Sequence, residues 1–264
     1  MGLVIQAVAA AGPWGEGVEE LAAWLAAPES TEDRSPVLKN VVGFVKSPFI
    51  NLTRHTQLAC LAEHYPAAPQ PARIGIVLAS VLGDTASADK ASASVAEGLT
   101  PQPLLFYQSI PVAIVGHLSI EFPLTGPLVC LSGGPELGGS ALETAQLMIA
   151  DGQVELVLLS YVEAGQGRWR SAAAGTLAEL WGEPVLPGWD CSISILIGLA
   201  DTGGKADTDM GIDIGVDIEA GTDTDDPPAG RRSVPRPLAD FIRLALTARS
   251  RTSAGIGASH DESR

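Results

Sequence analysis

Short hydrophobic runs alternate along this chain with longer stretches in which hydrophobic residues recur at helical spacing. The short runs are typical of buried strands, and the longer stretches are typical of helices that bury one face. This alternation predicts a layered α/β domain in which helices pack on a central sheet. The expected strands are residues 4–8, 74–80, 128–131, 154–160 and 192–197. The expected helices are residues 18–25, 52–64, 86–96, 111–121 and 142–150, and the expected loops are residues 28–40 and 166–189.

The pattern changes near residue 200, so we predict one folded domain over residues 1–200. Residues 201–230 are rich in Gly, Asp and Thr, a composition that predicts a disordered acidic linker. Residues 231–264 read as a basic, partly helical tail, because Arg231 and Arg232 precede hydrophobic residues at helical spacing. Such a helix either docks on the domain or folds only on a partner.

The Asp repeat of the linker invites comparison with a calcium loop. Asp207 and Asp209 begin like such a loop. Gly211 stands one place early and Glu219 one place late for an EF-hand, so we expect no metal site there.

Composition and charge narrow the possible functions. A hydrophobic fraction of 46% in 264 residues is enough for a buried core, and a formal charge of −15 argues against nucleic acid or an anionic membrane as partner. No apolar run reaches the roughly 20 residues of a membrane-spanning helix. Cys60, Cys130 and Cys191 are widely spaced in apolar runs, so we expect buried, reduced thiols and a cytoplasmic protein.

The candidate chemistry lies in residues 116–161. Gly126 and Pro127 form a turn before the predicted strand at residues 128–131. A Gly-rich turn follows over residues 132–140, and a long apolar helix then ends near Gly152.

This segment resembles the centre of a β-ketoacyl synthase. In that family, the strand leads to a sharp elbow that carries a nucleophilic Cys before an Ala-rich helix. Counted without gaps from Gly126 and from Gly152, the position of that Cys holds Pro135. Proline offers neither a nucleophile nor a backbone N–H, so we predict that this chain does not condense acyl chains itself.

The resemblance extends over about residues 1–200. Residues 4–25 are similar to the opening strand, Gly-rich turn and first helix of ketosynthases, and residues 74–83 are similar to a later strand and turn. The chain looks most like the stand-alone, chain-length-factor-like proteins of bacterial polyketide and aryl-polyene clusters. The resemblance implies a thiolase-like layered fold that corresponds to the N-terminal half of a ketosynthase.

The two His residues and the Lys that ketosynthases use for decarboxylation have no counterpart motif here. The four histidines are His55, His64, His117 and His260. Cys60 shares a helix face with His64 but not with His55, so a metal site is not expected. His117 precedes Glu121 by four residues, which predicts a structural pair.

The resemblance also implies partners. Phe106, Tyr107 and Gln108 lie where the family forms its dimer contact and the floor of its acyl tunnel, although Phe106 fits a core position equally well. The implied function is a non-catalytic, chain-length-factor-type subunit in polyketide, aryl-polyene or fatty-acid assembly, with no cofactor. The implied partners are an active ketosynthase subunit and, less favoured by the acidic charge, acyl carrier protein.

Two other functions stay open. One is an acyltransferase or hydrolase that uses Cys130 or Ser132, and the other is a scaffold without a role in acyl chains. The Gly-rich turn at residues 132–140 could hold the phosphate of a phosphopantetheine arm at a helix N-terminus, but tight packing explains the same glycines.

Overall fold

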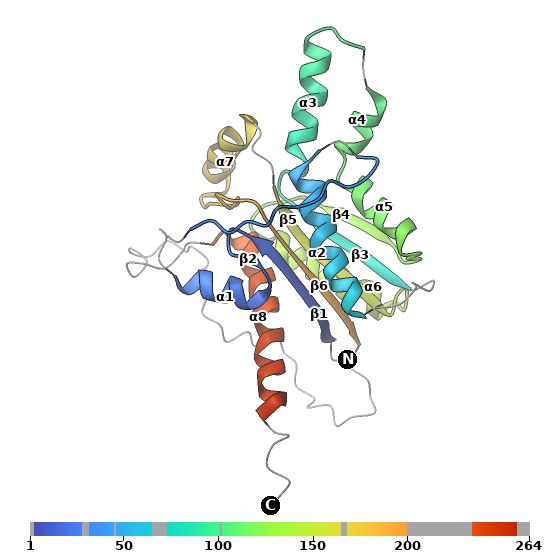
Figure 1. Cartoon of the computed structure of the whole chain (residues 1–264), viewed down its shortest axis with the longest axis vertical. Helices are drawn as coiled ribbons and strands as arrows, with labels where there is room; N and C mark the ends of the chain where they lie inside the picture. The colour runs from blue at the N-terminus through green and yellow to red at the C-terminus, as the bar shows by residue number, and fades with distance from the viewer. Residues whose placement is uncertain are drawn as a thin grey trace, which may run out of the picture.

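A single six-stranded sheet organises the chain, in the strand order β2, β1, β6, β5, β3, β4 (Figure 1). The computed structural model describes residues 3–27, 32–44, 46–64, 73–100, 102–164, 168–199 and 234–257. The strands are β1 (Leu3–Gly12), β2 (Gly15–Glu16), β3 (Ile74–Ala79), β4 (Leu128–Leu131), β5 (Leu156–Glu163) and β6 (Cys191–Leu199). The helices are α1 (Val18–Ala26), α2 (Pro48–His64), α3 (Thr85–Ala96), α4 (Pro103–Gln108), α5 (Val112–Glu121), α6 (Leu137–Ala150), α7 (Arg168–Trp181) and α8 (Arg236–Gly257). The α/β class is confirmed.

All five expected strands and all five expected helices are present, β4 at its predicted ends and the others with one or both ends shifted. The loop expected over residues 166–189 was wrong, because α7 occupies most of it. A run of three Ala and the later Leu and Glu residues of α7 favour a helix, whereas the glycines and prolines around it suggested a loop. The predicted linker at residues 201–230, with its calcium-like spacing, lies outside the described residues.

Two layers of helices cover the two faces of the sheet. Side chains alternate along each strand, so β5 sends Val157 and Leu159 to one face and Leu158 and Val162 to the other. The first face packs against α1, α6 and α8, and the second packs against α2 and α5. The parallel contacts of β3 with β4 and β5 place the ends of all three strands at one edge of the domain.

A buried polar seam fixes α2 on its face of the sheet. The Thr56 hydroxyl lies 2.7 Å from the Ser192 hydroxyl and 2.9 Å from the Ser194 hydroxyl. Ser160 bonds to Ser194 at 2.9 Å and accepts from the Gln57 amide at 3.2 Å. These hydroxyls satisfy one another in the core, which sets the register of α2 on the sheet without exposing polar atoms.

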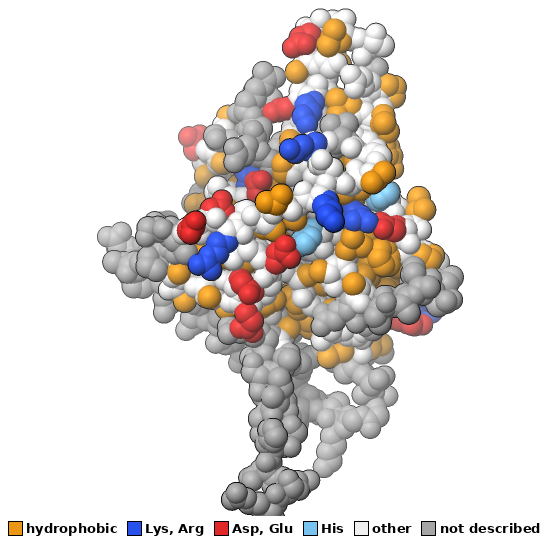
Figure 2. Space-filling view, in the orientation of Figure 1, with side chains coloured by type: hydrophobic (Ala, Val, Ile, Leu, Met, Phe, Trp, Pro, Cys, Tyr) orange, Lys and Arg blue, Asp and Glu red, His pale blue; other side chains and the backbone are white. Residues whose placement is uncertain are grey.

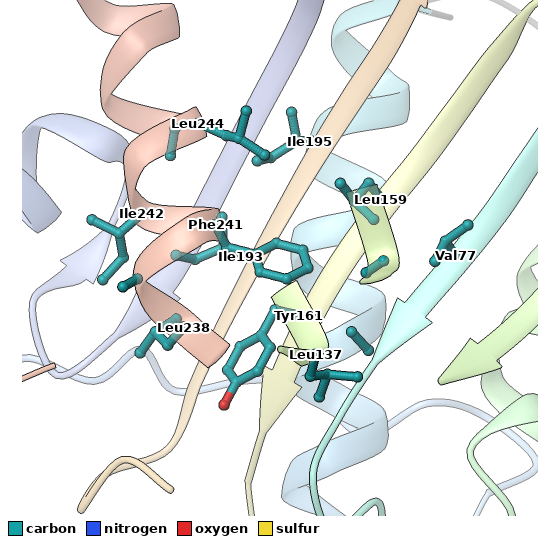
Figure 3. Close-up of a cluster of buried hydrophobic side chains, with 14 of the residues drawn as sticks. Val77, Leu137, Leu159, Tyr161, Ile193, Ile195, Leu238, Phe241, Ile242 and Leu244 are labelled. Carbon is teal, nitrogen blue, oxygen red and sulfur yellow. The ribbon is translucent and has the colours of Figure 1, made fainter. Parts of the chain in front are cut away.

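The C-terminal helix α8 packs on the domain, the first of the two arrangements considered for that segment (Figure 3). Phe241 is 1% exposed, and its ring centroid lies 5.3 Å from that of Tyr161 on β5. Leu238, Ile242 and Leu244 are also buried in the same cluster. The helical spacing of these apolar residues is therefore the spacing of a core-facing stripe.

Helices α3 and α4 project from the body and together form what we call the arm (Figure 1). The arm meets the rest of the domain through α7 and α5. Among the described helices, none is long and apolar enough to cross a membrane.

Gly126 precedes β4 at a point where no side chain fits. A Cβ at this position would lie 2.4 Å from the Ile74 carbonyl oxygen and 2.6 Å from the Gly75 nitrogen, both of them backbone atoms. We expect Gly126→Ala to lower the free energy of unfolding by about 3 kcal/mol, because backbone of β3 must move. The measurement is urea denaturation followed by circular dichroism.

The matched control is Gly139→Ala in α6, where a Cβ meets nothing within 4 Å. Alanine should raise stability there by about 0.5 kcal/mol, because it reduces the entropy lost in the helix. Equal effects of the two substitutions would contradict this account of Gly126.

Candidate functional site

The Gly-rich turn between β4 and α6 carries the position of the expected nucleophile. Pro135 lies in this turn, two residues before the first residue of α6. The Leu137 amide donates to the Gly134 carbonyl at 3.0 Å and closes the turn around Pro135. Pro135 brings no nucleophilic atom and no amide proton to this place, so it can contribute neither attack nor oxyanion stabilisation.

Close packing accounts for two of the glycines in this turn and helix start. A Cβ at Gly134 would lie 2.6 Å from the Trp181 ring, and a Cβ at Gly138 would lie 2.8 Å from Cβ of Asp240. The first contact brings the turn against α7, and the second brings α6 against α8. These glycines permit close approach of neighbouring elements.

The acidic side chains at the N-terminus of α6 are paired with arginines. Glu136 is the N-cap residue of α6, and its carboxylate pairs with Arg236 at 3.2 Å. Burial raises the pKa of Asp240, whose carboxyl lies against Gly138. Arg236 is already paired with Glu136 and Glu183, and the glycines of the turn meet close neighbours, so the packing explanation of the turn is the better one.

Cys130 lies on β4 at the open edge of the sheet. The expectation of buried thiols is confirmed for Cys60 and Cys191 and is wrong for Cys130. Cys130 is exposed, because none of the described strands pairs with β4 on its outer side. Although the residue as a whole is exposed, partial burial of its sulfur raises the pKa of Cys130 to about 11. A raised pKa disfavours the thiolate at neutral pH, so Cys130 is a poor nucleophile.

Ser132, the other candidate nucleophile, makes a structural hydrogen bond with its hydroxyl. Its hydroxyl donates to the Val81 carbonyl at 2.7 Å and joins the ends of β3 and β4. A hydroxyl that donates its proton to a carbonyl oxygen has no general base to activate it in this arrangement. The geometry therefore gives no support to hydrolysis at this residue.

The described histidines that show side-chain contacts have structural partners. His55 lies 3.3 Å from the Glu16 carboxylate. His117 lies 3.8 Å from the Glu121 carboxylate, so the predicted pair is confirmed, and Arg54 joins the same carboxylate at 2.6 Å. Across the described ranges, no three His, Cys, Asp or Glu side chains lie close enough to share a metal ion.

Glu163 is a buried carboxyl that the sequence analysis missed. It ends β5, is 2% exposed, and accepts hydrogen bonds from the Ser80 hydroxyl at 3.0 Å and from the Val81 amide. Burial raises its pKa to about 7, while bonds from Val81 and Ser80 and the charge of Arg170 oppose that rise. An acidic residue that closes an apolar strand was the available signal in the sequence.

Titration of Glu163 should make the domain less stable as the pH rises. The folded state holds the proton to about pH 7 and the unfolded chain releases it near pH 4.5, so the folded state binds more protons between these values. Tyr161, Cys191 and Arg170 are the other titratable or charged groups that act on this site. We expect the free energy of unfolding to fall by about 3 kcal/mol from this group across that window.

The measurement compares urea denaturation of wild type and Glu163→Gln from pH 4.5 to pH 8. Glutamine keeps an acceptor for Ser80 and Val81 but carries no charge, so the difference between the two proteins should widen in favour of the variant as the pH rises. Glu143→Gln, an exposed site on α6, should track the wild type. Parallel curves for wild type and Glu163→Gln would refute the assignment.

Hydrophobic side chains gather on the arm and the helix beside it. Of the twelve large hydrophobic residues that are exposed in the described structure, eight lie between residues 95 and 120. Figure 2 shows hydrophobic side chains along the arm and on the side of the body below it. The eight are Val95, Leu99, Leu104, Phe106, Tyr107, Ile110, Val112 and Ile120.

The helices that carry these side chains lead to the open edge of the sheet. Phe106 is 66% exposed and Tyr107 is 51% exposed, so the structure excludes the core position considered for Phe106. Helix α4 contacts α5, and α5 contacts the edge strand β4. We call α4, α5 and β4 together the apolar face. Its edge strand has the sequence LVCL, without the Lys or Pro that protects exposed edges, which indicates a surface built for a partner.

Gln108, the third residue predicted for this region, points elsewhere. It is 2% exposed, and its side-chain amide donates to the Gly43 carbonyl at 2.8 Å. The structure thus leaves Phe106 and Tyr107 exposed on α4 and buries Gln108 at the base of the arm.

One sheet between two helix layers, a strand-turn-helix elbow and an open sheet edge define a layered α/β domain. No protein-family model and no curated protein matches the chain. Among solved structures, a ketosynthase in complex with its chain length factor from Xenorhabdus doucetiae matches at a TM-score of 0.58 and 20% identity, over 76% of this chain and 81% of that chain.

Two further structures give the same result. The ishigamide ketosynthase/chain length factor matches at a TM-score of 0.55 and 18% identity, over 76% of this chain and 63% of that chain. A type II PKS acyl-carrier protein in complex with its ketosynthase, AntDE:AntF, matches at a TM-score of 0.56 and 18% identity, over 74% of this chain and 62% of that chain. The chain spans less than two thirds of these last two. Its fold is therefore the thiolase-like fold of ketosynthases and chain length factors, as the sequence predicted.

Proposed function

We propose that this chain is a non-catalytic, chain-length-factor-type subunit that pairs with an active ketosynthase in polyketide, aryl-polyene or fatty-acid assembly. The observation that carries the proposal is the apolar face of α4, α5 and β4 beside an elbow that holds Pro135. An exposed apolar surface of this kind favours a stable protein partner. The free thiols of Cys60 and Cys191 are consistent with a cytoplasmic setting.

The fold comparison favours a ketosynthase over other partners. The matching structures are ketosynthases described with chain length factors or an acyl-carrier protein. Pairing through β4 would extend the sheet into the partner and cover its free backbone groups. Phe106 and Tyr107 are the proposed contacts on the arm, either at the interface or against the acyl chain.

Acyl carrier protein is a weaker candidate for direct binding. The chain has a formal charge of −15, and an acidic carrier would be repelled by most of such a surface. We therefore place the carrier on the ketosynthase and the present chain beside it.

The test incubates the purified chain with acyl-loaded carrier protein and measures its intact mass, next to a pull-down of the ketosynthases from the same genome. We expect no acyl adduct and a co-purifying ketosynthase. An adduct that disappears in Cys130→Ala or Ser132→Ala would overturn the non-catalytic assignment. Absence of both adduct and ketosynthase would leave the scaffold interpretation.

A further inference from the structure

The base of the arm is hydrogen-bonded to the segment that leads into α2. We call the first turn of α3 and the last turn of α4 the feet of the arm. At the foot of α3, the Ser47 hydroxyl donates to Oδ2 of Asp84 at 2.7 Å. At the foot of α4, the Gln108 amide donates to the Gly43 carbonyl at 2.8 Å. These two bonds join residues that lie far apart in the sequence. They fix the start of α3 and the end of α4.

Asp84 connects the first turns of two helices. Its Oδ1 accepts from the Ser87 amide at 3.0 Å and its Oδ2 accepts from the Ser87 hydroxyl at 2.7 Å, so it caps α3. The Ser47 hydroxyl that bonds to Asp84 also accepts from the Ile50 amide at 3.2 Å at the start of α2. Asp84 is 2% exposed and Ser47 is 0% exposed, so each depends on these bonds for its polar atoms.

The loop that leads from β3 to the arm is held on the sheet from below. Ser80 donates to Glu163 on β5 at 3.0 Å, and the same hydroxyl accepts from the Gly83 amide at 2.8 Å. Gly83 has φ of 68°, a conformation that glycine adopts without steric cost. The loop therefore presents Asp84 to Ser47 in one defined position.

Beyond its feet, the arm has little hydrophobic anchorage of its own. Among the described residues of α3, only Ser87 is buried, and α4 buries only Leu105 and Gln108. Lys90 adds one exposed bond to the Lys46 carbonyl at 2.9 Å. Helix α3 also contacts α7 and α4 contacts α5, but few apolar side chains of the arm are buried, so the polar bonds at its base are a main restraint on its direction.

We propose that Ser47, Asp84 and Gln108 form a clasp that sets the orientation of the arm and so presents Phe106 and Tyr107 to the partner. The three are positioning residues, because their side chains lie at the base of the arm and Phe106 and Tyr107 lie on its surface. The role given to the arm, presentation of Phe106 and Tyr107 to a ketosynthase, rests on the proposed function. The clasp itself is a property of the isolated chain.

Hydrogen exchange of the full chain, read by mass spectrometry, tests the clasp without a ketosynthase. We expect Asp84→Ala and Gln108→Met to speed exchange of the α3 and α4 amides about tenfold and to leave β5 and β6 unchanged. Asp84→Asn, which keeps an acceptor for the Ser87 amide, should restore most of the protection. Asp89→Ala, a substitution on α3 outside the clasp, is the matched control and should exchange like the wild type.

The outcomes separate the clasp from general stability and from the proposed function. Unchanged exchange in the arm, or equal acceleration in β5 and β6, would overturn the clasp, whatever the result with a ketosynthase. If a ketosynthase pairs with the wild type, Gln108→Met should weaken that pairing about tenfold while Asp89→Ala does not. Unchanged pairing of Gln108→Met, with a released arm, would overturn the role of the clasp in docking.

Discussion

Replacement of Phe106 by Asp is expected to weaken pairing with a ketosynthase by about 100-fold. Phe106 is 66% exposed on α4 and is one of the eight exposed apolar side chains between residues 95 and 120. Buried aromatic anchors dominate binding energy at protein interfaces, and a carboxylate in the same place would lose its water without gaining a partner. The measurement is surface plasmon resonance with the immobilised ketosynthase.

Leu180→Asp provides the matched control for this prediction. Leu180 is 69% exposed on α7, outside the apolar face, so a new charge there should leave the affinity within about twofold. Both variants should unfold at the same denaturant concentration as the wild type, because neither side chain is part of the core. Full affinity in Phe106→Asp would place the interface elsewhere.

Truncation of Phe241 is expected to lower the free energy of unfolding by about 3–5 kcal/mol. Phe241 is 1% exposed between α8 and the sheet and contacts the Tyr161 ring, so alanine would leave a large cavity in the main core (Figure 3). A loss of this size is a substantial part of the stability of an ordinary domain. The measurement is urea denaturation at a fixed pH.

Phe106→Ala is the control for Phe241→Ala, since it removes the same side chain from an exposed position. We expect it to change stability by less than about 0.5 kcal/mol. The two phenylalanines therefore separate folding from docking. A Phe241→Ala protein as stable as the wild type would mean that α8 is not integral to the core.

The elements that hydrophobic pattern alone determines were predictable from sequence. Strand β4 was placed at its observed ends, and α8 was expected from the spacing of Leu238, Phe241 and Ile242. Helix α7 was missed because loop-forming residues surround a stretch whose helical tendency comes from Ala and Leu. Helix-forming residues and loop-forming residues favour different structures there, and only tertiary packing decides between a helix and a loop.

The properties of the site that follow from the covalent chemistry of a residue were predictable from sequence. Those that depend on the order of strands and on long-range contacts were not. That Pro135 cannot act as a nucleophile follows from its side chain and its missing N–H alone. The exposure of Cys130 depends on the position of β4 at the edge of the sheet, which strand order determines. The hydrogen bonds of Glu163 and Gln108 join segments that are distant in the sequence, so no local sequence pattern could predict them.

A subunit of this kind would separate chemistry from control of the product. The partner would supply the nucleophile, and this chain would supply a rigid sheet edge and an arm beside it. Pairing is then the property on which the whole account depends.

Native mass spectrometry of this chain co-expressed with the ketosynthase of the same genome tests that property most directly. The account predicts a species with the summed mass of one ketosynthase and one copy of this chain, which Phe106→Asp depletes and Leu180→Asp does not. A population that contains only self-associated copies of this chain, with the ketosynthase free, would contradict it.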